Sequence, residues 1–290
     1  MRIAITGAAG FLGSHLLNKL KASGQDVLPI TRTTQDPLQR IQEYEPDIVV
    51  HCAWKGGNNY RDVNDVSQIT NVVDGIELLK VISSLSKKPK FVGFGSFAEY
   101  GNIANMALED DFEKPTNMYG LSKLTLKNYS EGFCKMHDLS WSWIRPCYVY
   151  GPGDVRTRLI PSVISKLLAN ESVFLDSCNK VVDYIYVDDF INYAYSVIIE
   201  PSQGVYNICS GQQYQLRDVI QTIATLLDAE GRVHFDEETL RILTSSNICG
   251  SNLKVRRLTS FSKLTSLEEG LLKTIEHNKN NNKNEERDSH

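Results

Sequence analysis

The amino-acid sequence predicts an α/β protein with a doubly wound parallel sheet. Strand-like and helix-like segments alternate from the N-terminus, and the third strand-like segment, residues 47–53, is apolar enough to be buried on both faces. A glycine-rich turn joins the first strand to the first helix. Repeated strand–helix–strand units of this kind build a parallel sheet whose ligands bind at the carboxyl ends of the strands.

The first half of the chain supplies most of these units. The first strand, Arg2–Thr6, is β-branched and apolar, and the helix after it has apolar residues at helical spacing and stops near Gly24. Asp36 and Pro37 form a favourable N-cap and first-turn pair for a short helix that ends at Tyr44. The predicted strands cover residues 2–6, 26–31, 47–53, 90–96 and 139–145, and the predicted helices cover residues 11–22, 37–44, 66–86 and 119–137.

Beyond residue 153 the alternation becomes irregular. We interpret residues 154–277 as a smaller C-terminal α/β part that covers the ligand, with about 183–200 rejoining the N-terminal part. Residues 278–290 are almost all Asn, Lys, Glu, Arg, Asp and Ser, which cannot bury a core, so we predict a disordered tail. The predicted helices of this half cover residues 159–169, 188–199 and 216–227, and its predicted strands cover residues 180–187 and 205–209.

The turn after the first strand has the spacing G-x-x-G-x-x-G, a variant of the phosphate-binding G-x-G-x-x-G. Glycines allow the backbone to approach a pyrophosphate, and the first N–H groups of the following helix donate to the anion. A strand before the turn and an amphipathic helix after it favour a dinucleotide site over a plain glycine-rich turn, and hence a Rossmann-type dinucleotide-binding domain over residues 1–153. The predicted phosphate contacts are Gly7, Ala9, Gly10, Phe11, Leu12 and Gly13.

The end of the second strand indicates which dinucleotide binds. An acidic residue at this position holds the ribose 2′-OH of NAD, whereas a nearby arginine accommodates the 2′-phosphate of NADP. Residues 29–34 read Pro-Ile-Thr-Arg-Thr-Thr, with no acid before Asp36. We therefore predict NADP(H), bound through Thr31 and Arg32. NAD is the alternative if Arg32 is only a solvated loop residue.

Composition argues against several classes of protein. The formal net charge of −4 disfavours a nucleic-acid binder, and no apolar run approaches the roughly 20 residues of a membrane helix. The N-terminus lacks the layout of a signal peptide, and the six cysteines form no C-x-x-C pair, so we expect reduced thiols in a cytoplasmic protein. The six histidines show no H-E-x-x-H spacing, and we expect no metal site.

Tyr119 and Lys123 lie four residues apart on one face of a predicted helix. In a chain of this composition the spacing Tyr-x-x-x-Lys would occur about once by chance, so the spacing alone indicates little. The location of the pair is more informative, because it follows the fourth predicted strand, which ends at Ser96. A ketone that accepts a hydride develops oxyanion character and needs a proton. Tyr119 can donate it, because the Lys123 cation lowers the phenol pKa from about 10, and Ser96 adds a second hydrogen bond. We predict these three residues as the catalytic set.

A set of motifs runs along nearly the whole chain: residues 7–13, 47–53, Asn71 with its following helix, 95–101, the Tyr119–Lys123 pair, Arg145-Pro146, 150–153, 182–189 and 266–271. In these motifs the chain resembles the extended short-chain dehydrogenase/reductase family, in its NAD-dependent epimerase/dehydratase group. The resemblance implies that Ser96, Tyr119 and Lys123 are catalytic and that Cys52, Ala53, Trp54, Asn71 and Pro146 contact the cofactor. Because relatives often dimerise through a four-helix bundle, it also implies a homodimer.

Two departures from the family narrow the reaction. In the related 4,6-dehydratases the two residues after the catalytic Ser or Thr are Asp and Glu, and GDP-fucose synthase-like enzymes have a cysteine at the second position. Here these residues are Phe97 and Ala98, which do not titrate. Hydride transfer remains, as a reduction or a 4-epimerisation. The short 33–45 segment and the Thr31-Arg32 ending resemble reductases that exchange NADPH with solution more than epimerases that retain NAD.

The nucleotide-sugar substrate that the resemblance implies lacks one expected contact. Relatives often have an arginine before the Asp-Tyr-Ile element, where it holds the diphosphate, but here the residue is Val182. Arg156, Arg158 or Arg256 could take this role, and we assign Arg158. Lys55 and Asn58, which follow the third strand, are candidates for lining the sugar pocket. The other predicted substrate contacts are Trp54, Ser96, Phe97 and Tyr148.

Three functions fit these observations. The first is NADP-dependent reduction of the 4-keto group of a nucleotide-linked deoxyhexose for surface polysaccharide. The second is a nucleotide-sugar 4-epimerase with tightly bound NAD. The third is a non-catalytic NADP-sensing regulator, since this fold also serves as a redox sensor. The complete Ser96–Tyr119–Lys123 set favours an enzyme, because a sensor has no need of a proton donor.

Overall fold

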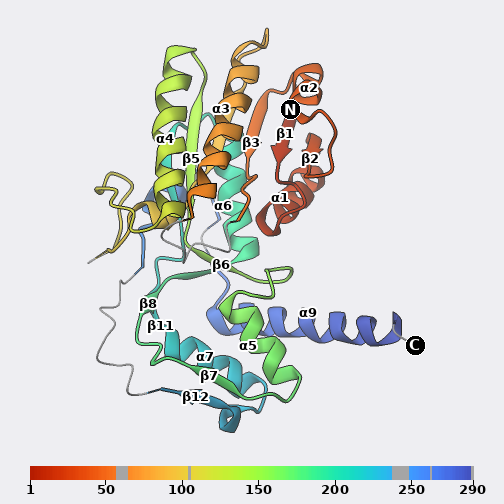
Figure 1. The fold of residues 1–290 in the computed structure, drawn as a ribbon, viewed down its shortest axis with the longest axis vertical. Coiled ribbons are helices and arrows are strands. Elements are labelled where there is room, and N and C mark those ends of the chain that lie inside the picture. Colours follow the sequence, from red (N-terminus) through yellow and green to blue (C-terminus); the bar gives the residue numbers. More distant parts are fainter. Residues whose placement is uncertain (57–64, 104–105, 237–247, 262, 289–290) are drawn as a thin grey trace.

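The computed structural model describes residues 1–56, 65–103, 106–236, 248–261 and 263–288, arranged as an upper and a lower lobe (Figure 1). The main strands are β1 Arg2–Thr6, β2 Asp26–Ile30, β3 Ile48–His51, β4 Lys90–Phe94, β5 Trp141–Pro146 and β10 Gly204–Ile208. The short strands are β6 Tyr148–Tyr150, β7 Val173–Leu175, β8 Val181–Val182, β9 Tyr184–Tyr186, β11 Tyr214–Gln215 and β12 Val233–Phe235. The helices are α1 Phe11–Ala22, α2 Pro37–Tyr44, α3 Ile69–Ser83, α4 Met118–Met136, α5 Leu159–Leu168, α6 Val187–Ile199, α7 Leu216–Leu226, α8 Leu253–Arg256 and α9 Leu267–Asp288, with the 3-10 helices η1 Val66–Gln68, η2 Phe97–Glu99 and η3 Glu230–Arg232.

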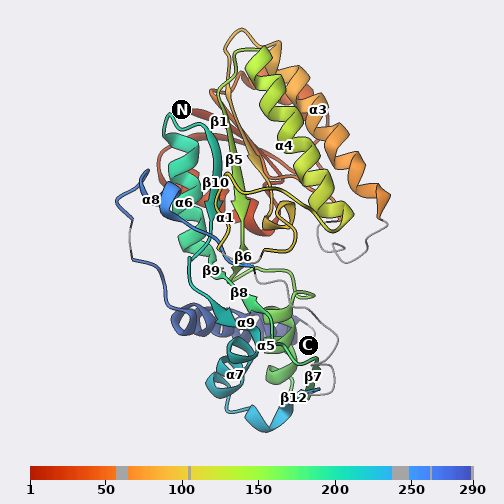
Figure 2. The ribbon, with the colours of Figure 1, turned by 90° about the vertical axis from the view of Figure 1, so that its left-hand side faces the viewer.

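The upper lobe is a six-stranded parallel sheet in the order β2-β1-β3-β4-β5-β10. Helices α3 and α4 cover one face, and α1 and α6 cover the other (Figure 2). Successive residues of β1 alternate between the two cores: Ile3 and Ile5 pack on the α1 side and Ala4 on the α3 side. Each fully buried aliphatic side chain of this kind contributes about 1.5–3 kcal/mol. The predicted doubly wound parallel sheet is confirmed.

The order of the strands places the topological switch point of the sheet at the carboxyl ends of β1 and β3. The chain leaves β1 for β2 on one side and then returns to β3 on the other, so the connections after β1 and after β3 diverge. In open α/β sheets the crevice at this point, outside the carboxyl ends of the strands, is where ligands bind. The predicted phosphate turn, residues 7–13, lies at this crevice.

The lower lobe is connected to the upper lobe by the chain that continues from β5. After Cys147 the chain forms β6, which pairs in parallel with β9 between the lobes (Figure 1). Below this pair, α5 packs against α7 and α9, beside the small sheets β7–β12 and β8–β11. All six cysteines are unpaired thiols. No helix in the described ranges is both long and apolar enough to cross a membrane.

The division of the chain differs from the predicted one. The sheet gains β10 as its sixth strand, and α8 packs on β10 and α6, although both strand and helix fall within the predicted 154–277 part. Val205 faces one core and Tyr206 the other, so β10 buries both faces as an inner strand does. The predicted strand 180–187 is two strands in different sheets. It breaks at Asp183, whose buried carboxylate accepts bonds from Ser210 and Gly211.

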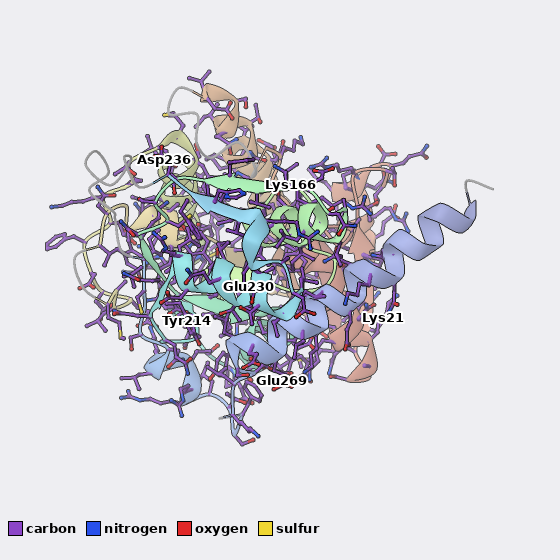
Figure 3. The ribbon with its side chains drawn as sticks, turned by 90° about the horizontal axis from the view of Figure 1, so that it is seen from below. Lys21, Lys166, Tyr214, Glu230, Asp236 and Glu269 are labelled. Atoms are coloured by element: carbon purple, nitrogen blue, oxygen red, sulfur yellow. The ribbon has the colours of Figure 1, made fainter. Side chains whose placement is uncertain are left out.

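Two predictions about helix ends also need correction. Asp36 precedes α2 with a left-handed φ of 45° and makes no side-chain cap. Helix α9 continues to Asp288, so residues 278–288 are helical and project from the body (Figure 3). Leu271 and Ile275 are buried and anchor the first turns of α9, from which a helix propagates easily.

His51, the last residue of β3, is buried where the strand meets the site. Its Nδ1 lies 2.8 Å from the Thr6 hydroxyl, and its Nε2 has no hydrogen-bond partner among the described residues. Burial lowers the pKa of His51 to about 4, and the Lys123 cation adds to this effect. The ring is therefore neutral in the folded protein at neutral pH.

We predict that His51→Gln removes part of the acid sensitivity of folding. The folded pKa is depressed, so the unfolded chain takes up the proton first. The stabilising contribution of the neutral ring is present above about pH 6.5 and is lost as the pH falls toward 4, amounting to about 2–3 kcal/mol. Urea unfolding between pH 7 and pH 4.5 measures the slope. His234→Gln, at an exposed position of β12, should keep the wild-type slope. Equal slopes for both variants contradict the prediction.

Candidate active site

The phosphate turn is built from backbone contacts that exclude side chains. Gly7 has a φ of +71°, and a Cβ there would lie 2.7 Å from the Ala53 nitrogen. A Cβ on Gly13 would lie 2.1 Å from the Gly7 oxygen. Gly10, at the N-cap of α1, has no side chain to cap the helix, so its first N–H groups remain donors for an anion. The turn fits a pyrophosphate.

The end of β2 lies beside this turn, because the Ala8 N–H donates to the Ile30 carbonyl. The Thr31 hydroxyl lies 3.0 Å from that of Thr33, and Arg32 is exposed next to them. The structure thus places Thr31 and Arg32, the two residues predicted to contact a 2′-phosphate, beside the phosphate turn.

Trp54 follows β3 and contacts the predicted catalytic residues. The Lys123 ammonium lies 3.8 Å from the centre of its ring, and the Tyr119 ring meets it edge to face at 6.0 Å. The indole N–H donates to Gln68 Oε1 at 2.7 Å. Trp54 thus forms one wall of the site, and Cys52 and Ala53 lead into it from β3.

The side chain of Asn71, a predicted cofactor contact, forms its hydrogen bonds within the protein. Its Oδ1 accepts from the Lys55 N–H at 2.7 Å, and its Nδ2 donates to the Lys55 carbonyl at 3.1 Å. The side chain therefore orders the turn after β3. The candidate Asn58 lies outside the described residues.

Ser96, Tyr119 and Lys123 converge at the carboxyl end of β4. Ser96 follows the strand, and Tyr119 and Lys123 project from the first turns of α4. The Ser96 side chain lies near enough to Tyr119 to lower its pKa, and Lys123 Nζ donates to the Phe94 carbonyl at 2.6 Å. Helix α4 approaches closely because a Cβ on Gly120 would lie 2.4 Å from the Ala98 oxygen. The structure thus brings the predicted catalytic set together.

Burial dominates the electrostatics of this set. It raises the pKa of Tyr119, while the Ser96 hydrogen bond and the Arg158 cation lower that pKa. Burial lowers the pKa of Lys123 to about 7, against the opposing charge of Glu99. A phenol next to an ammonium whose proton is this labile is suited to general acid–base chemistry near neutral pH.

The remaining predicted residues divide between the site and the core. Pro146 ends β5, and Tyr148 packs on Tyr184 with ring centres 5.5 Å apart. Phe97 is only 3% exposed and packs on Tyr100 in a small core cluster, so it is placed as a core residue rather than as an open substrate contact.

Of the three candidate arginines, Arg158 lies in the best position. Its charge acts on Tyr119, and it pairs with Asp154 at 3.2 Å while its side chain stays 45% exposed. Arg256 lies on α8, where its charge acts on Tyr193. Arg156 is exposed.

Sequence reasoning missed Glu99 and Arg145 as parts of the site. Both side chains are fully buried and form an ion pair at 2.7 Å directly behind Ser96. The available signal was Ser96-x-x-Glu99, a capping-box pattern, which the structure realises at η2.

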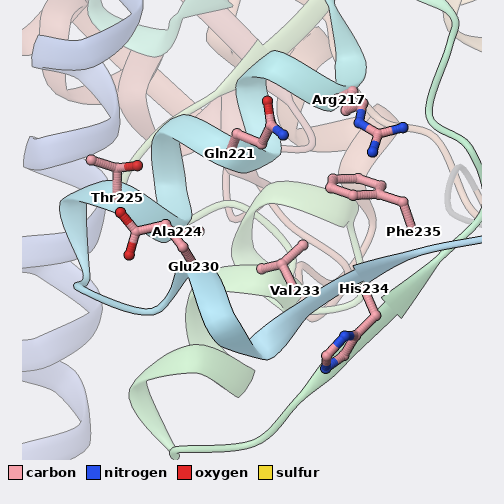
Figure 4. A pocket seen from close by; sticks show the side chains of 8 residues that line it. All are labelled: Arg217, Gln221, Ala224, Thr225, Glu230, Val233, His234 and Phe235. Carbon is pink, nitrogen blue, oxygen red and sulfur yellow. The ribbon is translucent and has the colours of Figure 1, made fainter.

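An open cavity of about 620 Å³ lies in the lower lobe, away from these residues. Figure 4 shows it between α7 and β12, with the Arg217 guanidinium over the Phe235 ring at 4.4 Å. None of the predicted site residues lines it. Its lining residues are Arg217, Gln221, Ala224, Thr225, Glu230, Val233, His234 and Phe235.

Residues 3–209, more than half of the chain, match the NAD dependent epimerase/dehydratase family. The chain belongs to this family. CDP-abequose synthase of Salmonella typhimurium is 27% identical over 251 residues, which are 75% of this chain and 78% of that protein. GDP-6-deoxy-D-mannose reductase of Pseudomonas aeruginosa is 25% identical over 295 residues, 93% of this chain and 94% of that protein.

A solved structure extends the match to the fold of nearly the whole chain. UDP-glucose 4-epimerase of Thermotoga maritima with UDP-glucose has a TM-score of 0.87 at 22% identity, over 97% of this chain and 99% of that one. Family membership makes an NAD(P) dinucleotide the cofactor class, which the phosphate turn fits. In the part of the chain that the structure describes, no group of three or more His, Cys, Asp or Glu is placed to hold a metal ion.

We predict that Gly13→Ala destabilises the protein and weakens dinucleotide binding. Its Cβ would meet a backbone oxygen, which cannot move as a side chain can. Gly132→Ala is the matched control. It lies in α4, a Cβ there meets nothing within 4 Å, and the change should stabilise by about 0.5–1 kcal/mol. Thermal unfolding with and without NADPH measures both effects. A Gly13 variant that keeps the wild-type NADPH-dependent shift contradicts the assignment of the turn.

Proposed function

We propose that the protein is a cytoplasmic, NADP-dependent nucleotide-sugar 4-ketoreductase, which reduces the 4-keto group of a nucleotide-linked 6-deoxyhexose for surface polysaccharide. The convergence of Ser96, Tyr119 and Lys123 beside the phosphate turn carries the proposal. The similarity to CDP-abequose synthase and GDP-6-deoxy-D-mannose reductase supports the substrate class. The unpaired cysteines are consistent with a reducing compartment.

When bound, the reduced nicotinamide supplies the hydride, and the residues of the chain handle the proton. Tyr119 donates its phenolic proton to the developing alkoxide, and the Ser96 hydroxyl hydrogen-bonds to the same oxygen. Lys123, 5.9 Å from the Tyr119 ring centre, stabilises the phenolate that forms. The Trp54 ring covers the ammonium of the buried Lys123 and excludes water from it.

The surroundings of the set support reduction without acid–base chemistry on the ring carbons. Phe97 and Ala98 do not titrate. The nearest carboxylate, Glu99, is buried and bonded to Arg145. Burial raises the pKa of the Cys147 thiol well above its usual value, so it cannot serve as a base at neutral pH. A 4-epimerase, favoured by the fold match to UDP-glucose 4-epimerase, would retain NAD, which the exposed Thr31-Arg32 corner does not favour.

We also propose a homodimer through α3 and α4. These helices lie side by side on the outer face of the sheet (Figure 2). Ile69 and Val73 of α3 and Leu121 and Tyr129 of α4 are all 40–52% exposed. The two apolar rows belong to helices that pack against each other. A second copy packed on this face would remove the apolar surface from water.

The reaction test offers dTDP-, CDP- and GDP-linked 4-keto-6-deoxyhexoses with NADPH in D₂O. We expect NADPH and sugar to be consumed in equal amounts, with no deuterium at C3 or C5 above a no-enzyme control. Tyr119→Phe should lower kcat by about 10²–10⁴-fold, because the proton donor is lost, whereas Tyr129→Phe, exposed on the same helix, should not. Ring deuterium, or conversion without NADPH consumption by protein that retains NAD, contradicts the proposal. So does a Tyr119→Phe variant with more than a tenth of the activity.

The cofactor test is Arg32→Asp. An acid at the end of β2 repels a 2′-phosphate and can accept from a ribose 2′-OH, so the ratio of kcat/KM for NADPH over NADH should fall. Arg40→Asp makes the same charge change at an exposed position of α2 and should leave the ratio unchanged. An unchanged ratio in Arg32→Asp means that Arg32 is a solvated loop residue.

A further inference from the structure

Glu99 is fully buried and its carboxylate meets only donors. Its Oε1 accepts from the Ser96 backbone N–H at 2.8 Å and from the Trp143 indole N–H at 3.1 Å. Its Oε2 accepts from Arg145 Nε at 2.7 Å. The side chain thus links the backbone of a predicted catalytic residue to β5, the strand that carries both Trp143 and Arg145.

Arg145 is itself held from several directions. Its guanidinium donates to the Tyr100 hydroxyl at 2.6 Å, lies over the Tyr100 ring, and pairs with Glu113. The Tyr100 hydroxyl in turn donates to Asn207 on β10 at 2.9 Å. Because Trp143 and Arg145 belong to β5 and Asn207 belongs to β10, the sheet fixes the position of the Glu99 carboxylate.

The Ser96 hydroxyl has a fixed direction as well. It accepts from the Ala98 N–H at 3.1 Å, which leaves its single proton available on the side of Tyr119, whose pKa the Ser96 side chain lowers. The side chain can point this way only while the backbone of Ser96 keeps its place, and the Glu99 carboxylate holds that backbone.

We propose that Glu99 is a positioning residue for ketone reduction: locked by Arg145 and Trp143, it holds the Ser96 N–H and thereby aims the Ser96 hydroxyl at the reacting oxygen. The proposal rests on the catalytic role of Ser96 proposed above. Stability alone gives little reason for the arrangement, since buried ion pairs can often be replaced by apolar residues without loss of stability.

The test compares two carboxylates that bind the same guanidinium. In Glu99→Gln an amide N–H₂ must face either Ser96 and Trp143 or Arg145, all of which are donors. Glu113 binds Arg145 and Lys127 from the other side, and none of its contacts in the described chain involves Ser96. Glu113→Gln therefore weakens the same ion-pair network without touching Ser96.

We expect Glu99→Gln to lower kcat by about 10–100-fold, with KM for NADPH nearly unchanged, because a displacement of about 1 Å is costly at a reacting centre. Glu113→Gln should stay within about threefold of wild type. The assay uses the keto sugar of the dTDP, CDP and GDP panel with the highest kcat/KM. Hydrogen exchange of the segment 94–100 should be faster in Glu99→Gln and unchanged in Glu113→Gln.

A double-mutant cycle separates positioning from a structural role. In the Ser96→Ala background the hydroxyl is absent, so adding Glu99→Gln should lower kcat by less than about threefold. If Glu99 acted only through the fold, the further loss of kcat would be as large as in the wild-type background. Full additivity, or an equal loss in Glu113→Gln, overturns the proposal.

Two further arms keep the test decisive. If Glu99→Gln does not fold, the cycle is run with Glu99→Asp, which keeps the charge and withdraws the carboxylate by one methylene. If neither variant folds, Glu99 is structural and the proposal fails. Retained activity in Ser96→Ala with loss in Tyr119→Phe overturns the positioning role alone, while retained activity in Tyr119→Phe overturns the proposed function instead.

Discussion

Direct contact between backbone segments at glycines is the constraint on which the site depends. Gly7 lets the β1–α1 turn touch the backbone that follows β3, Gly13 lets α1 pack on the Gly7 carbonyl, and a Cβ at either position would overlap backbone atoms. The same device recurs across the sheet edge. A Cβ on Gly95 would lie 2.2 Å from the Trp143 indole nitrogen, and Gly120 brings α4 against η2. Without these approaches the dinucleotide turn, Ser96 and the start of α4 could not share one crevice.

Close packing of this kind leaves little water, so the charges at the edge need protein partners. Glu99 and Arg145 satisfy each other, and the Arg145 guanidinium uses Glu113 and Tyr100 for its remaining donors. Lys123 has fewer partners for its ammonium group. Its ammonium has three donors, and the contacts found for it are the Phe94 carbonyl and the face of Trp54. A ligand that brings hydroxyl acceptors to Lys123 would raise its pKa from about 7, so ligand binding and proton uptake are coupled at this residue.

The sequence predicted well those elements whose cause is local. The bounds of β1, α1 and α2 were predicted exactly as observed, because β-branched runs, helical spacing and turn residues determine them within a few positions. The proximity of Ser96, Tyr119 and Lys123 could be predicted because the ends of parallel strands meet at one edge, whereas their catalytic role stays a prediction. The incorrectly predicted elements depend on contacts between residues that lie far apart in the sequence. Asp183 divides a predicted strand because it binds Ser210, and β10 joins β5 across some sixty residues. The role of Glu99 also depends on Arg145, 46 residues further along the chain.

The missing arginine before the Asp-Tyr-Ile element has a similar explanation. Val182 is 3% exposed and packs with Cys178 and Leu216 in an apolar cluster, so this position contributes to the core of the lower lobe. A diphosphate must then meet positive charge elsewhere. Arg158 precedes α5, and Asp154, a buried carboxyl whose pKa burial raises to about 6, restrains its guanidinium from one side. Its charge already acts on Tyr119. A diphosphate bound at Arg158 would offset this charge, so such binding would be linked to the acidity of Tyr119.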